Sequence, residues 1–297
     1  MTSESTTSTA AARTVNRPQI NPTNLWQQAG LMVWRNLIYT KRRPEMLSDV
    51  TMQPIMFVLL FAFVFGAAID APGASYKEFL LPGIMGQTMM FTAFIVASGL
   101  TNDLEKGIID RFRSLPIQRS SVLVGRALAS LLHSSIGIVV MALTGLIIGW
   151  RIRTNVVDAV VGFALVLLFG FGMIWFGVLV GSWLRSVEAV NGFLFSTLFP
   201  LSFLSNAFVP TGPMPTVLRV IAEWNPMSSL VQALRVSWGN GPDMPDAALP
   251  LQHPVLSTVI SILIVILGIL GLLSLPITQY PDIAPPTVSV RATYTGA

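Results

Sequence analysis

The chain has 297 residues, of which 53% are hydrophobic and only 11% are charged, whereas a soluble domain carries roughly 25% charged residues. The net charge of +4 comes from basic residues that lie beside apolar stretches, a placement that suits membrane orientation and argues against nucleic-acid binding. The absence of cysteine excludes disulfides, thiolate metal sites and a cysteine nucleophile.

The N-terminal part of the chain predicts a tail followed by a surface helix. Residues 1–21 are rich in Ser, Thr and Ala without the apolar core of a secretory signal, so we expect a disordered cytoplasmic tail. Residues 22–44 mix Trp26 and Trp34 with polar side chains and end in a run of three basic residues and Pro44. This pattern favours a helix at the membrane interface over a short soluble helix.

Long apolar stretches recur along the chain and predict an all-α membrane protein with about six transmembrane helices. Each is long enough to cross a hydrocarbon core of about 30 Å with some tilt. The expected spans are 47–69, 82–101, 123–149, 158–183, 189–209 and 254–275.

The distribution of Lys and Arg predicts the orientation of these spans. With the N-terminus in the cytoplasm, the inner side receives more than twice as many basic residues as the outer side. On the outer side, the segment 210–253 contains MPTVLRVIAEW, which predicts a short amphipathic helix.

The inner loop after the second predicted span is the most informative stretch. Asn102 and Glu105 have the spacing of a helix N-terminus with its reciprocal acid, and residues 115–117 end the charged amphipathic segment with a proline. Such a segment between two spans could dock a soluble partner. The alternative is a solvated loop whose cations only set the topology.

No pattern of catalytic residues is present, and we expect neither catalytic nor metal-binding residues in this chain. The sequence lacks a phosphate-binding P-loop, a G-x-S-x-G elbow and an H-E-x-x-H motif. His133 lies within a predicted span beside two serines, and a neutral histidine bonded to a neighbouring helix is favoured over an intramembrane enzyme.

Polar and small residues within the spans allow two interpretations. Gln87, His133 and Asn191 are candidates for lining a transport path, although hydrogen bonding between helices is the more common role of such residues. Gly177 and Gly181 form a G-x-x-x-G motif, which predicts close helix packing.

Four motifs carry a resemblance to a known family. They are Trp34-Arg35-Asn36 ahead of the first span, the stretch from Asp103 to Ile117, Ser205 to Pro210, and Trp224-Asn225-Pro226 followed by Ala233-Leu234-Arg235. In this order, over about residues 20–252, they resemble the membrane subunit of a type-2 ABC exporter of the daunorubicin-resistance permease group.

The resemblance implies an interfacial elbow helix followed by six spans, a homodimer or heterodimer of permeases in the bacterial plasma membrane, and an outer re-entrant region at about 206–235. It implies amphiphilic cargo such as drugs, polyketides or lipids. It further implies a separate ABC-type ATPase subunit that binds ATP and Mg, so that this chain itself holds no cofactor. The residues implied to contact the ATPase are Arg35, Asp103, Glu105, Gly107, Arg111 and Arg113.

The C-terminal segment departs from this family. Residues 253–297 include Gln279-Tyr280-Pro281 and Thr293 to Ala297, and they resemble the start of a resistance-nodulation-division efflux pump. We therefore expect a chimera with a foreign sixth span and a Pro-rich tail. The alternative function is that of a transport-incompetent chimera or membrane anchor.

Overall fold

The computed structural model describes residues 44–66, 75–107, 119–184 and 186–241, together with three helical positions, Gly30, Trp34 and Ile38. Every regular element in these ranges is helical, which confirms the all-α prediction. The predictions for the tail at 1–21 and for the foreign segment at 253–297 lie outside the described residues. The interfacial placement of the segment 22–44 stays a prediction.

Five of the predicted spans lie in described parts of the chain, apart from residues 67–69 of the first, and each corresponds to a helix. Helix α2 (Pro44–Leu60) continues into a π-helical turn, η1 (Phe61–Phe65). The others are α3 (Tyr76–Glu105), α5 (Arg119–Ile148), α6 (Val156–Trp183) and α7 (Val187–Phe203). By length and composition, the described part of the chain contains three helices able to cross a membrane, which lie in α3, α5 and α6; α2 and α7 provide shorter apolar helices.

The fifth span was predicted to reach residue 209, but α7 ends at Phe203. The side-chain amide of Asn225 donates hydrogen bonds to the carbonyl oxygens of Leu201 and Leu204 at 2.6 and 2.7 Å. These bonds satisfy carbonyls that have no partner within a helix end, so the chain can leave the helix here.

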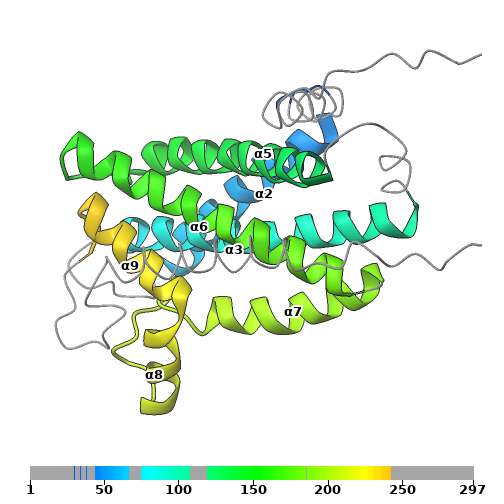
Figure 1. Cartoon of the computed structure of the whole chain (residues 1–297). Coiled ribbons are helices and arrows are strands. Elements are labelled where there is room, and N and C mark those ends of the chain that lie inside the picture. The colour runs from blue at the N-terminus through cyan, green and yellow to red at the C-terminus, as the bar shows by residue number, and fades with distance from the viewer. Residues whose placement is uncertain are drawn as a thin grey trace, which may run out of the picture.

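Two shorter helices follow on the predicted outer side. The amphipathic prediction is confirmed by α8 (Thr216–Trp224). Helix α9 (Pro226–Trp238) was not foreseen as a separate element, and most of its residues are buried, including the polar Ser228, Gln232 and Arg235. Figure 1 shows α8 and α9 at the end of the bundle where α3 begins.

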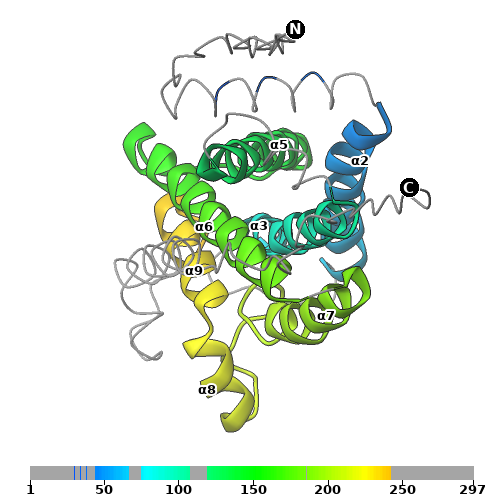
Figure 2. The ribbon, with the colours of Figure 1, turned by 45° about the vertical axis from the view of Figure 1, so that its right-hand side comes forward.

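Helix α3 is the centre of the bundle and packs against α2, α5, α6, α7 and α9. Figure 2 shows it surrounded by these helices, with α5 and α7 on different sides of it. The G-x-x-x-G prediction is confirmed, because a Cβ atom on Gly177 or Gly181 would come within 3.0 Å of the backbone of Ala93 or Ala97 in α3. The absence of side chains at these glycines lets two backbones approach closely.

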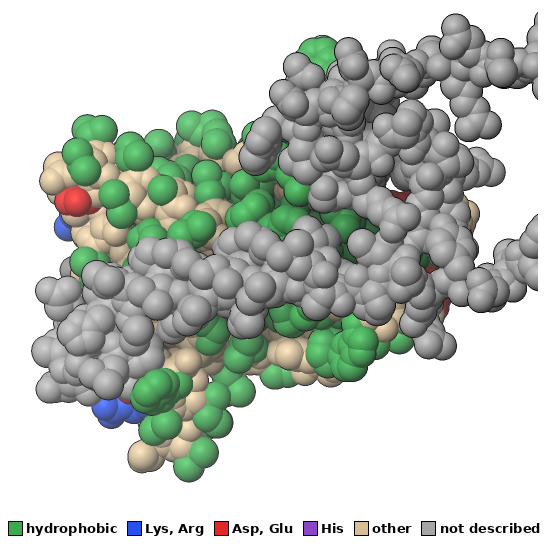
Figure 3. All heavy atoms as spheres, viewed as in Figure 1, with side chains coloured by type: hydrophobic (Ala, Val, Ile, Leu, Met, Phe, Trp, Pro, Cys, Tyr) green, Lys and Arg blue, Asp and Glu red, His purple; other side chains and the backbone are tan. Residues whose placement is uncertain are grey.

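The outer surfaces of the bundle are apolar over most of the helix length. Helix α5, for example, exposes Leu132, Ile136, Val139 and Leu143, which fall on one face at helical spacing. Where the described helices are visible in Figure 3, hydrophobic side chains are the most common type along them, and the visible charged side chains lie toward the ends. This distribution suits a body immersed in hydrocarbon.

Candidate functional site

The last turn of α3 joins two other helices through its carboxylates. Asp103 forms an ion pair with Arg126 of α5, and the two side chains are 29% and 28% exposed. The Glu105 carboxylate accepts a hydrogen bond from the backbone N–H of Val187, the first residue of α7, at 3.1 Å. The C-terminal end of α3 is therefore fastened to the N-terminal ends of α5 and α7.

Helix α3 ends at Glu105, and two residues later the backbone turns through a left-handed conformation at Gly107. Gly107 has a φ of 62°, and its N–H donates to the carbonyl of Leu104 at 3.0 Å. The prediction that Asn102 and Glu105 begin a new helix is wrong, because α3 runs through both residues and the carbonyl of Asn102 accepts the N–H of Lys106. The carboxylate of Glu105 caps α7 instead of its own segment.

Of the six residues implied to contact an ATPase, the structure places three together. Asp103, Glu105 and Gly107 lie within the last turn and terminus of α3. Within the chain, Asp103 pairs with Arg126 and Glu105 bonds to the N–H of Val187. Contact of the three residues with an ATPase stays a prediction. The other three, Arg35, Arg111 and Arg113, lie outside the described residues.

Two of the candidate path-lining residues form hydrogen bonds between α3 and α7. The amide of Gln87 donates to the hydroxyl of Ser202 at 2.9 Å, and Asn191 accepts from the hydroxyl of Ser98 at 2.6 Å. Moving along α3 from Gln87 to Ser98, the partners on α7 run backwards from Ser202 to Asn191, as expected for an antiparallel pair. Both side chains thus hold α3 against α7, and a role in lining a path is not tested by this geometry.

The third candidate, His133, is not brought together with them. It lies on α5, on another side of α3 from α7, and its side chain is partly exposed. Its neighbour Ser134 shares a hydrogen bond of 3.1 Å with Thr92 of α3. Among the described residues, no group of three or more His, Cys, Asp or Glu side chains is placed to hold a metal ion.

The opposite end of the bundle contains a buried arginine, Arg235, which the sequence analysis placed in a family motif without predicting its burial. Arg235 of α9 is 1% exposed. Its guanidinium donates to the carbonyl oxygens of Phe79, Asn206 and Ala207 at 2.8 to 3.3 Å. It also lies 3.4 Å from the ring centroid of Phe79, a cation–π arrangement. One side chain thus joins α9 to the start of α3 and to the turn after α7.

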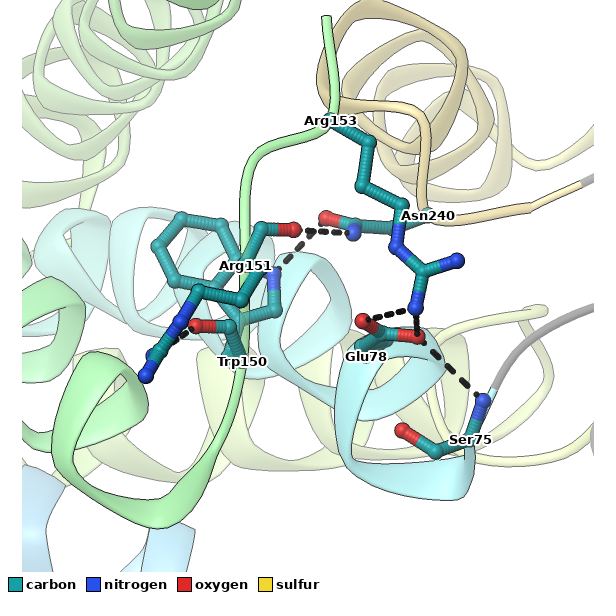
Figure 4. A network of polar contacts seen from close by, with 6 residues as sticks. All are labelled: Ser75, Glu78, Trp150, Arg151, Arg153 and Asn240. Carbon is teal, nitrogen blue, oxygen red and sulfur yellow. Dashed lines mark hydrogen bonds and ion pairs between the residues drawn. The ribbon is translucent and has the colours of Figure 1, made fainter.

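A second polar network at this end is drawn in Figure 4, with Ser75, Glu78, Trp150, Arg151, Arg153 and Asn240. Glu78 is 3% exposed and accepts from Arg153 at 2.8 and 3.1 Å. The amide of Asn240 accepts from the Trp150 indole at 2.7 Å and donates to the Arg151 carbonyl at 2.8 Å. The network ties the α5–α6 connection to the start of α3 and to the chain that leaves α9.

The helices from α2 to α9 lie within a stretch of sequence that matches one protein family. The family model described as ABC-2 type transporter matches residues 27–238, and residue 238 is the last residue of α9. The chain belongs to the ABC-2 type transporter family. It is a membrane-embedded permease subunit of an ABC transporter.

Curated relatives cover the same part of the permease. This chain is 31% identical to the "Daunorubicin resistance ABC transporter permease protein DrrB1" of Streptomyces coeruleorubidus over 203 residues, which are 68% of this chain and 72% of that protein. It is 28% identical to the "Putative transport permease ycf38" of Cyanophora paradoxa over 217 residues, 70% of this chain and 73% of that protein.

A different family accounts for the C-terminus of the permease. The AcrB/AcrD/AcrF family model matches residues 247–297. A segment of 47 residues is 47% identical to the "Multidrug resistance protein MdtF" of Escherichia coli strain K12, covering 16% of this chain but only 4% of that protein. The two family matches do not overlap, which supports the expectation of a chimera.

Proposed function

We propose that this permease exports amphiphilic compounds, such as drugs, polyketides or lipids, across a bacterial plasma membrane, with energy from a separate ABC-type ATPase. One observation carries the proposal: the ABC-2 match extends over all the long described helices and ends with α9. The daunorubicin-resistance name of the relative that is 31% identical supports drug-like cargo.

In this proposal the ATPase binds ATP and Mg and docks on the cytoplasmic side. It contacts the elbow segment at Arg35 and the region from Asp103 to Arg113, with the N-terminus of the permease in the cytoplasm. Two permease subunits, identical or related, enclose the path between them. Movement of the docked region passes along α3, and the contacts of Asp103 with Arg126 and of Glu105 with Val187 support joint movement of α5 and α7 as rigid bodies.

The test is co-expression of the full chain with a candidate ATPase, followed by transport measurements in inverted membrane vesicles. We expect ATP-dependent accumulation of daunorubicin or of an amphiphilic dye, and none with an ATPase variant that cannot hydrolyse ATP. Absence of ATP-dependent transport in a stable permease–ATPase complex would contradict the export proposal.

Docking has its own test. Reversing the charges with Arg111→Glu and Arg113→Glu is expected to weaken capture of the ATPase while leaving membrane insertion unchanged. Equal capture of the ATPase by the parent chain and the double variant would show that this segment is not the docking element.

The alternative is a chimera that inserts into the membrane but does not transport. It is favoured by the match of residues 247–297 to a second transporter family, in the place where the permease family would have its own sixth span. A chain in which residues 253–297 are replaced by the corresponding part of the daunorubicin relative distinguishes the two. Transport by the replaced chain but not by the parent chain would support the alternative.

A further inference from the structure

We propose that the groove between η1, the start of α3 and the end of α5 binds an anionic phospholipid, with the phosphate at Lys77 and an acyl chain along α2. This site lies far along the bundle from the 103–107 end of α3. The inference does not depend on the identity of the ATPase or of the cargo.

The groove contains a pocket of about 520 Å³ lined by apolar side chains, one serine, one tyrosine and the ammonium group of Lys77. Phe63 and Gly66 bound it on one side, Ser75 and Lys77 lie at the start of α3, and Ile148 belongs to the end of α5. The mixture of an aromatic ring, aliphatic walls and a cation suits a ligand that is itself amphiphilic.

Two contacts hold the ammonium group of Lys77 beside this pocket. Its ammonium donates to the carbonyl of Ile148 at 3.4 Å and lies 4.9 Å from the ring centroid of Phe63. An ammonium has three N–H donors, so two remain for an anion. Within the described ranges, Lys77 forms no ion pair with a carboxylate.

A second basic residue, Arg151, lies two positions after Gly149, which lines this pocket. Arg151 follows α5 and donates to the carbonyls of Leu146 and Trp150, at 2.6 and 2.8 Å. The nearby acid, Glu78, is buried and already paired with Arg153, so it does not neutralise Lys77. Basic residues at the end of a bundle of apolar helices lie at the depth of lipid phosphates.

An apolar stripe on α2 continues from this pocket toward the middle of the bundle. Met52, Met56, Leu60 and Phe63 recur at helical spacing and are 53 to 65% exposed. A second pocket of about 440 Å³ lies on the stripe, lined by Met56, Phe57, Leu59 and Leu60. From Phe63 to Met56 the helix rises by about 10 Å, within the length of one acyl chain in a leaflet of a ~30 Å core.

These observations favour a lipid over the other occupants of such a surface. A small free anion would make no use of the apolar stripe. A second copy of the chain could cover the stripe, and the quenching experiment below distinguishes it from a lipid. Glu78 and Glu223, which are 3% and 5% exposed and each paired with an arginine, could not bring a carboxylate to Lys77. A phosphate with an acyl chain satisfies both the cation and the stripe.

The experiment uses the absence of native cysteine to place one probe on the full chain. Met56→Cys carries a bimane fluorophore, and the protein is reconstituted into vesicles of phosphatidylcholine with a small fraction of lipid brominated on its acyl chains. The brominated lipid is either phosphatidylglycerol or phosphatidylcholine. Val139→Cys, on an exposed position of α5, is the matched control probe.

We expect brominated phosphatidylglycerol to quench the probe at position 56 at roughly one-fifth of the concentration needed for phosphatidylcholine, since one Lys near a surface contributes about 1 kcal/mol toward an anionic lipid. Lys77→Gln should abolish this preference and Lys77→Arg should keep it. At position 139 the two lipids should quench equally.

Equal quenching by both lipids at position 56 would overturn the proposal, because the stripe would then hold only ordinary surrounding lipid. Absence of quenching at position 56, with normal quenching at position 139, would also overturn it and would indicate that a second protein surface covers α2. The comparison of two lipids on the Lys77-containing protein needs no Lys77 variant, so a variant that fails to fold does not prevent a decision.

Discussion

The carboxylate of Glu105 accepts a hydrogen bond from the backbone N–H of Val187, which lies 82 positions further along the chain. The N–H groups in the first turn of a helix have no partner within the helix, and the helix dipole favours a negative charge there. Glu105 at the end of α3 thus stabilises the beginning of α7. The same turn of α3 holds α5 through Asp103, so three helices meet at one helix end.

Replacing Glu105 separates its capping role from a role in binding an ATPase. Glu105→Ala should destabilise the detergent-solubilised permease by about 0.5 kcal/mol, because the first turn of α7 loses its negative partner. Glu105→Gln keeps an oxygen acceptor and should lose less stability. If both variants retain stability but lose ATPase capture, the carboxylate acts on the partner and not on α7.

The ion pair between Asp103 and Arg126 is testable by exchanging the charges. Asp103→Arg and Arg126→Asp should each lower the resistance of the permease to unfolding in denaturing detergent, and the double exchange should recover about 0.5 kcal/mol, as expected for a partly exposed pair. Losses that simply add in the double variant would show that the pair contributes nothing.

The contact between α6 and α3 depends on two glycines. Gly177→Ala and Gly181→Ala place a methyl group within 3.0 Å of the α3 backbone, and each should cost about 1–3 kcal/mol in detergent unfolding assays. Gly192→Ala in α7 is the matched control, because a Cβ atom there meets nothing within 4 Å. Equal stability of all three variants would contradict the close approach of α3 and α6.

Removing the guanidinium of Arg235 should disrupt the predicted outer end. Arg235→Met leaves the carbonyls of Phe79, Asn206 and Ala207 without their shared donor, and each buried unsatisfied group costs about 1–3 kcal/mol. We expect loss of monodisperse protein in size-exclusion chromatography, with partial retention for Arg235→Lys. Arg151→Met, at an exposed arginine, serves as the control, and similar behaviour of both methionine variants would count against a special role for Arg235.

His133 tests the hypothesis of an intramembrane enzyme. We expect His133→Ala to retain complex assembly and ATP-dependent transport, because the described residues place no acidic cluster with it. Thr144→Ala, on the same helix but away from the two serines, is a suitable comparison. Loss of activity by His133→Ala alone, with assembly intact, would favour the enzyme hypothesis.

The sequence predicted the helices well because their cause is local. Hydrocarbon offers no partner to backbone N–H and C=O groups, so an apolar stretch of span length must be helical whatever its neighbours are. The first five predicted spans accordingly correspond to α2 with η1, α3, α5, α6 and α7. The spacing of Gly177 and Gly181 likewise predicted a packed surface, because small residues one turn apart always lie on one face.

The contacts of the candidate site could not be predicted in the same way. The spacing of Asn102 and Glu105 suggested a helix start, whereas α3 continues through them and Glu105 caps a different helix. Hydrogen bonding between helices was the favoured role for Gln87 and Asn191, but the sequence did not show that Ser202 and Ser98 are their partners. A local pattern identifies a polar group but not the distant partner that satisfies it.

By itself the sequence determined a membrane-embedded helical chain, the positions of its long helices and the family of residues 27–238, since these follow from composition, period and motif order. Only the tertiary structure decided that α3 is central, that α7 ends at Phe203 and that Arg235 is buried. Arg235 bonds the carbonyl of Phe79 from 156 positions away. Such a bond exists only once packing has brought the two segments together and excluded water from both.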